Sequence, residues 1–72
     1  MEFKEIYMGR YSVENYPLEV SIVPEDADNF KFDLYFVGGS KHFLGAYQTI
    51  DGLKDKIEDV TLKFDARRNS LV

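Results

Sequence analysis

The stretch that most constrains the fold is residues 30–37, where bulky apolar side chains occupy every second position. This period of two is typical of a half-buried β-strand. Gly38-Gly39 follows, a pair that favours a tight turn, so we expect a hairpin whose second strand covers about 41–48. The apolar face of the first strand consists of Phe30, Phe32, Leu34 and Phe36, and the opposite face of Lys31, Asp33 and Tyr35.

The length of the turn sets the register of this hairpin. A two-residue loop pairs Leu34 with Phe43, and a four-residue loop pairs Phe36 with Phe43. Both registers place Phe43 and Tyr47 on the apolar face, whereas a slip of one residue would invert every side chain. The same reasoning places His42 opposite Tyr35 or Val37 on the outer face. We therefore predict an aromatic core made of Phe30, Phe32, Phe36, Phe43 and Phe64.

Upstream, residues 18–22 alternate in the same way between Pro17 and Pro24, which mark the ends of a second strand. Residues 3–13 have no clean period. We favour one strand over this stretch, bent near Gly9, and helical spacing over residues 3–9 is the alternative.

After the hairpin, an apolar stripe at Ile50, Leu53, Ile57 and Val60 predicts a helix. Thr49 is suited to cap it, and Gly52 weakens it, so we expect the helix to be short. Residues 60–65 alternate again and predict a final strand, followed by a tail over residues 66–72.

These elements predict one α+β domain over residues 1–72. Its sheet is mostly antiparallel with four to five strands, and one short helix packs on one face, in the order β-β-β-β-α-β. No cysteine is present to form a disulfide, so a chain this small needs dense packing or self-association. Six phenylalanines and five tyrosines suit dense packing, and a homodimer would provide self-association.

Charge is distributed unevenly along the chain. Residues 1–36 contain eight acids and three bases, whereas residues 37–72 contain five acids and six bases. An acidic region of this kind repels nucleic acid and attracts basic partners. Direct binding to nucleic acid is therefore not expected.

The sequence offers little for catalysis. His42 is the single histidine, and although Ser40 is close enough to contact it, no third group completes a recognisable motif. Residues 25–29 lack the glycine and the flanking helices of a calcium loop, and we interpret Asp28 and Asn29 as turn residues that form side-chain-to-backbone hydrogen bonds. We thus expect a protein that is not an enzyme, with no catalytic residue, no cofactor and no metal.

No apolar run is long enough to span a membrane, and no signal peptide is visible, so we expect a cytoplasmic location. The leading hypothesis is a small acidic binding protein, a stoichiometric inhibitor or adaptor, that docks a basic partner surface such as that of a nucleic-acid-handling protein. Inhibitors and adaptors encoded by mobile elements are analogous in size and layout alone. The alternative is a structural homo-oligomer assembled through a sheet edge or a tyrosine face. The predicted partner-binding residues are Glu14, Glu19, Glu25, Asp26, Asp28 and Tyr35.

Overall fold

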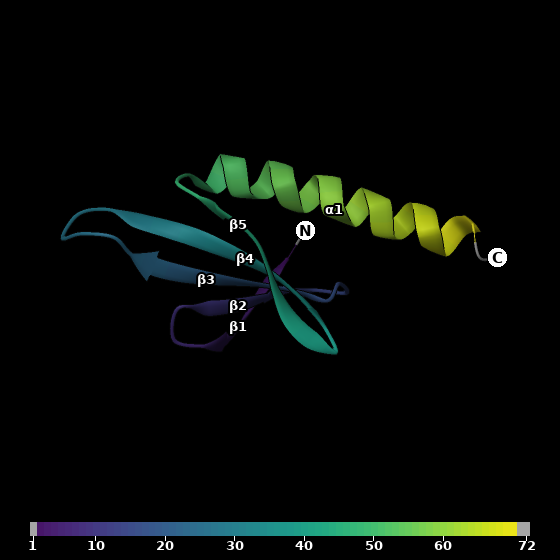
Figure 1. Cartoon of the computed structure of the whole chain (residues 1–72), viewed down its shortest axis with the longest axis horizontal. Coiled ribbons are helices and arrows are strands. Elements are labelled where there is room, and N and C mark those ends of the chain that lie inside the picture. Colours follow the sequence, from purple (N-terminus) through teal and green to yellow (C-terminus); the bar gives the residue numbers. More distant parts are fainter. Residues whose placement is uncertain (1, 71–72) are drawn as a thin grey trace.

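A computed structural model describes residues 2–70, and it consists of a five-stranded antiparallel sheet followed by one helix (Figure 1). The strands pair in chain order, so β1 and β5 form the two edges. This arrangement confirms the predicted α+β class. The elements are β1 (Phe3–Tyr7), β2 (Arg10–Val13), β3 (Leu18–Pro24), β4 (Phe30–Gly38), β5 (Ser40–Tyr47) and α1 (Ile50–Ser70).

The N-terminal stretch is a hairpin and not one bent strand. The chain reverses at Met8-Gly9, and β1 and β2 then pair with each other. Gly9 has a φ of 76°, which glycine adopts without steric cost. Its carbonyl oxygen accepts a 2.8 Å hydrogen bond from the Ile22 N–H, which ties the turn to β3. The prediction identified the right residue for the bend but underestimated the change in chain direction.

The predicted buried face of the β4–β5 hairpin is only half right. Leu34 pairs with Gly45 and Phe32 with Tyr47, as a four-residue loop requires, but a bulge at Leu44 shifts the register nearer the turn. Beyond the bulge, Phe43 pairs with Tyr35 on the outer face. The prediction for Phe43 was therefore wrong, because the extra residue inverts the side chains between the bulge and the turn.

The same bulge moves the histidine. His42 pairs with Phe36, on the face that carries the core, and not with Tyr35 or Val37 on the outer face. The rings of His42 and Phe36 lie 6.2 Å apart. The predicted position of His42 was thus wrong for the same physical reason.

The predicted final strand is instead part of α1. Thr49 caps the helix as predicted, because its Oγ1 accepts a 3.1 Å hydrogen bond from the Gly52 N–H. The helix then continues for 21 residues, since no glycine or proline follows Gly52. Phe64 continues the stripe of Ile57 one helical repeat later, whereas Leu62 is 62% exposed. The alternation over residues 60–65 was therefore misread, and the order of elements is five strands followed by a long helix.

Residues 66–70, predicted to be part of a tail, lie in α1, and residues 71–72 lie outside the described residues. Side-chain contacts join this end of the helix to the β2–β3 turn. The Tyr16 hydroxyl lies 3.0 Å from both carboxylate oxygens of Asp65. Arg68 donates to the Asn15 carbonyl oxygen at 3.2 Å and lies over the Tyr16 ring. These contacts attach the C-terminal half of α1 to the sheet.

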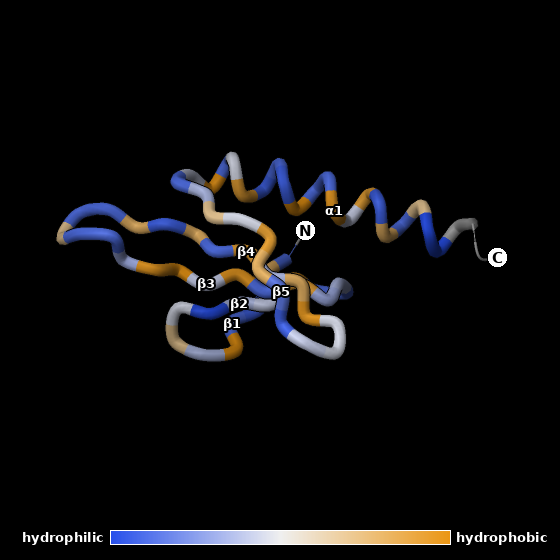
Figure 2. Tube along the Cα trace, viewed as in Figure 1, coloured by the Kyte–Doolittle hydropathy of each residue, from blue (hydrophilic) through white to orange (hydrophobic). Residues whose placement is uncertain are grey.

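The core lies between α1 and the inner face of the sheet, where the apolar segments of the first helical turns lie toward the strands (Figure 2). Phe32, Phe36 and Tyr47 pack at its margin. Phe30 and Phe43, predicted to be core residues, are instead 51% and 59% exposed. The buried apolar residues are Val13, Leu18, Val20, Leu34, Leu53 and Ile57.

Within residues 2–70, no helix combines the length and the apolar character that a membrane crossing requires.

Candidate functional site

The fold separates the charges of the chain into three regions. The outer face of the sheet, which points away from α1, carries four bases and two acids, and α1 carries five of each. All the remaining charged residues are acids, and they lie on β1 or in the segments that flank the strands. The outer-face charges are Lys4, Arg10, Lys31, Lys41, Glu19 and Asp33, and the remaining acids are Glu2, Glu5, Glu14, Glu25, Asp26 and Asp28.

Three of the predicted partner-binding residues, Glu25, Asp26 and Asp28, lie in the β3–β4 loop, which projects from one end of the sheet (Figure 1). We call this segment, residues 25–28, the acidic loop. Asp26 orders it, because its Oδ1 accepts 3.0 Å hydrogen bonds from the N–H groups of Asp28 and Asn29. The side-chain-to-backbone hydrogen bonds of this turn therefore come from Asp26 and not from Asp28 or Asn29, and the Asn29 Nδ2 instead donates to the Asp26 carboxylate.

These hydrogen bonds also explain the titration of Asp26. Hydrogen bonds from the Asn29 side chain and from the Asp28 N–H hold the pKa of Asp26 below its ordinary value of 3.8. The carboxylate is thus charged at neutral pH and fixed in place. Glu25 and Asp28 remain exposed on either side of it.

Glu14 lies at the opposite end of the sheet from the acidic loop. It follows β2, whereas the loop follows β3, and β3 spans about 20 Å at 3.3 Å per residue. Glu2 is its neighbour, and a side-chain hydrogen bond with Glu2, together with the charge of that group, raises the pKa of Glu14 above 4.5. The predicted partner-binding residues therefore do not form one cluster.

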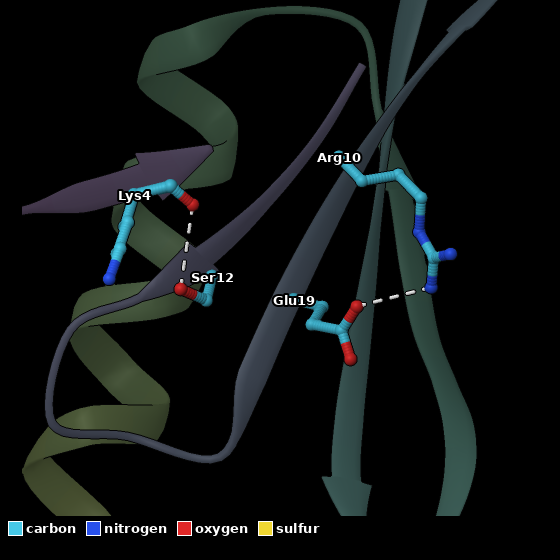
Figure 3. Close-up of polar contacts among 4 residues, drawn as sticks. All are labelled: Lys4, Arg10, Ser12 and Glu19. Atoms are coloured by element: carbon cyan, nitrogen blue, oxygen red, sulfur yellow. Dashed lines mark hydrogen bonds and ion pairs between the residues drawn. The ribbon is translucent and has the colours of Figure 1, made fainter. Parts of the chain in front are cut away.

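Glu19 and Tyr35 lie on the outer face, where they pair with each other across β3 and β4. Glu19 Oε1 accepts a 3.2 Å hydrogen bond from Arg10 Nη2, and nearby Ser12 Oγ donates to the Lys4 carbonyl oxygen at 3.4 Å (Figure 3). The charge of Glu19 is thus already paired within the chain.

The Tyr35 ring is also covered from within the chain. It meets Phe43 edge-on at 5.6 Å, and Lys41 Nζ lies 4.3 Å from the ring centroid. Such contacts are favourable by themselves, because a cation is attracted to the face of an aromatic ring. Tyr35 is therefore held in a packed cluster on the outer face.

Asp33, between these groups, is 8% exposed although no layer covers the outer face. Lys31 Nζ lies 3.8 Å from Asp33 Oδ1, yet this oxygen has no hydrogen-bond partner among the described residues. The outer face thus buries one acid by means of its own side chains.

The inner face contains a feature that the sequence did not reveal. The backbone of α1 lies over β4 and β5, and beside it an apolar hollow of about 360 Å³ remains open toward β1 and β2. Lys54 is the one charged residue in the lining. The lining residues are Phe3, Tyr11, Val20, Ile22, Phe32, Ile50, Leu53 and Lys54.

Two further hollows continue this one toward the other end of the sheet. One of about 340 Å³ is lined by Val13, Glu14, Tyr16, Glu58 and Thr61. A third hollow, of about 730 Å³, shares Phe3 with the first hollow and Glu14 with the second, and Lys4 and Ser12 of the outer face also line it. We call the three together the inner groove. Phe3 and Tyr11, which had no clear role in the sequence, were the only signal for it.

The Ser40 and His42 side chains do make contact, at 2.9 Å between Oγ and Nε2, but both are exposed at the β4–β5 turn. In the described structure no carboxylate contacts the His42 ring. A catalytic triad needs such a group to orient the base. Among residues 2–70, no group of three or more His, Asp or Glu side chains could hold a metal ion.

Comparison of the chain with protein families, with curated proteins and with solved structures finds no match.

Proposed function

We propose that this chain is a non-enzymatic binding protein of the cytoplasm that docks a basic partner surface through its acidic loop, as a stoichiometric inhibitor or an adaptor. The observation that carries this proposal is the separation of charge. Apart from the outer face of the sheet and α1, the charged side chains of residues 2–70 are six acids and no base, whereas the acids of the outer face are paired with bases. A basic surface, such as that of a protein that handles nucleic acid, is the natural complement.

The geometry of the acidic loop suits this role. Asp26 fixes the backbone of residues 26–29, so Glu25 and Asp28 are held in position before the partner arrives. Preorganisation of this kind reduces the entropy that binding costs. Complementary charge also accelerates the encounter, and salt screens this effect over about 10 Å at 0.1 M.

The test is affinity capture from a lysate of the source organism, at low and high salt and after nuclease treatment. The double variant Glu25→Lys/Asp28→Lys should lose the captured partner and remain folded, because both side chains are exposed. The variant Asp55→Lys/Asp59→Lys makes the same charge change on α1, outside the groove lining, and should retain the partner. Equal capture by both variants would remove the proposal.

A second candidate, a homo-oligomer formed through a sheet edge, is favoured by one observation on β5. Residues 42–50 carry no charge, and Phe43 and Leu44 on this edge strand are 59% and 39% exposed. An uncharged edge can pair with a second copy without repulsion between like charges. Sedimentation over a range of concentrations should then show a dimer that Leu44→Lys dissociates. A mass that stays monomeric at every concentration would exclude this candidate.

A further inference from the structure

We propose that the inner groove binds a basic amphipathic segment of the partner. The apolar side chains of this segment lie on the floor of the groove, and its Lys or Arg side chains lie at the rim. The inference rests on the proposed function, because it names the partner chemistry that would accompany docking to the acidic loop.

The floor of the groove is apolar and open. Phe3 and Ile50 at its margins are 37% and 53% exposed, and Ile22 and Tyr11 between them are half-buried. Exposed apolar residues gathered around one hollow mark an interaction site more often than isolated ones do. An apolar side chain of a partner would remove this surface from water.

The rim of the groove is acidic. Glu2, Glu14 and Glu58 line the hollows, and Glu5 shares their face because it pairs with Tyr11. Only Lys4 and Lys54 oppose them among the lining residues. Glu2 and Glu14 share a side-chain hydrogen bond, and the charge of Glu2 raises the pKa of Glu14 further, so a cation placed beside them would favour the charged form of Glu14.

This combination selects the occupant. A second copy of the chain would bring a net charge of −4 to a rim that is already acidic. Anionic lipid or nucleic acid would meet the same repulsion. An amphipathic segment laid in a groove places apolar anchors on the floor and leaves its flanks free for charge pairs.

The experiment uses two synthetic peptides of equal length and charge, a Leu/Lys repeat with an amphipathic pattern and a Ser/Lys repeat without apolar residues. Each is titrated into the ¹⁵N-labelled full chain and followed by amide chemical shifts. We expect the Leu/Lys peptide to bind about tenfold tighter, since burial of about two methylene groups has this effect. The largest shifts should occur at Phe3, Tyr11, Ile22 and Ile50.

Variants test the position of the peptide. Ile50→Ser should remove most of the advantage of the Leu/Lys peptide. Leu62→Ser should keep it, because Leu62 is exposed on the same helix but outside the groove lining.

The outcomes separate this inference from the proposed function. Three results would overturn the proposal that the groove binds the partner: equal affinity of the two peptides, chemical-shift changes confined to residues 25–28, or no binding of either peptide. If the Leu/Lys peptide binds at the groove and Glu25→Lys/Asp28→Lys leaves its affinity unchanged, the result would support the groove as a binding site. It would count against a role of the acidic loop in docking.

Discussion

The two faces of the sheet solve the same packing problem in different ways. On the outer face, which α1 does not cover, side chains of the sheet contact one another: Arg10 pairs with Glu19, and Lys41 and Phe43 cover Tyr35. Among the described residues, Asp33 Oδ1 is left there without a hydrogen-bond donor. On the inner face α1 covers β4 and β5 but leaves an apolar groove beside β1 and β2.

This difference indicates which face would gain more free energy from contact with a partner. A face on which most charges and rings already contact one another gains little from a new contact, because the partner must first displace the internal one. A face with open apolar area, bordered by acids that form no ion pair among the described residues, gains both burial and charge neutralisation. This comparison supports the proposal that a partner docks to the inner groove and the acidic loop, and that the outer face is structural.

The largest effect should come from the covered part of the inner face. Leu34 is 0% exposed beneath α1, and Leu34→Ala should lower the free energy of unfolding by about 3 kcal/mol, the usual cost of such a cavity. Urea unfolding followed by circular dichroism measures this loss. Ile50→Ala, at the open groove, should lose less than about 1 kcal/mol. Similar losses at the two sites would show that the groove is part of the core.

The neighbouring residue on β4 tests the outer face. Asp33 is buried with one oxygen that lacks a hydrogen-bond donor, so Asp33→Val should leave the free energy of unfolding unchanged or raise it by about 1 kcal/mol. The same urea experiment measures it. A loss of more than about 2 kcal/mol would show that the pair with Lys31 is strongly stabilising.

A double-mutant cycle measures the Arg10–Glu19 pair. The Arg10 side chain is 42% exposed and that of Glu19 17%, so we expect a coupling energy of only about 0.5 kcal/mol, reduced further by salt. The cycle uses Arg10→Met, Glu19→Gln and the double variant. A coupling well above this value, unchanged in 1 M salt, would contradict the view of this pair as a screened surface contact.

The smallest effect should come from Glu14, and it depends on pH. Its pKa is raised in the folded protein, so the associated stabilisation is complete below the unfolded value of 4.5 and is lost as the pH rises through the folded pKa. Glu14→Gln removes the charge that causes this loss of stability, so the variant should have a higher urea midpoint of unfolding than the original chain at pH 7. The difference from the original chain should vanish below pH 4.5. A variant that is less stable at pH 7 would give the wrong sign.

Local sequence patterns predicted much of the fold, and they failed where contacts between distant segments decide the structure. Alternation identified β3 and β4, and Thr49 marked the start of α1 correctly. The bulge at Leu44 left no sign in the turn residues, so the side chains between it and the turn were placed on the wrong faces. Residues 60–65 fit both a strand and a helix, and the absence of a helix breaker after Gly52 was the signal that should have decided.

The candidate site was less predictable than the fold. Clustering of Glu25, Asp26 and Asp28 follows from their closeness in the chain, and the structure retains it. The placing of Glu14 and Glu19 depends on strand order and register, which separate them from the loop. The inner groove depends on which strands α1 covers, and this information is spread over the whole core.

The central claim is that a partner docks on the inner face, and the most direct test is to cross-link the partner from one face or the other. A photoreactive benzoylphenylalanine replaces Tyr11 in the groove or, in a second protein, Tyr35 on the outer face, and each is irradiated in the lysate. We expect an adduct at position 11 that high salt prevents and none at position 35, and the cross-linked peptide of the partner should be both basic and amphipathic. An adduct at position 35 and none at position 11 would contradict the central claim.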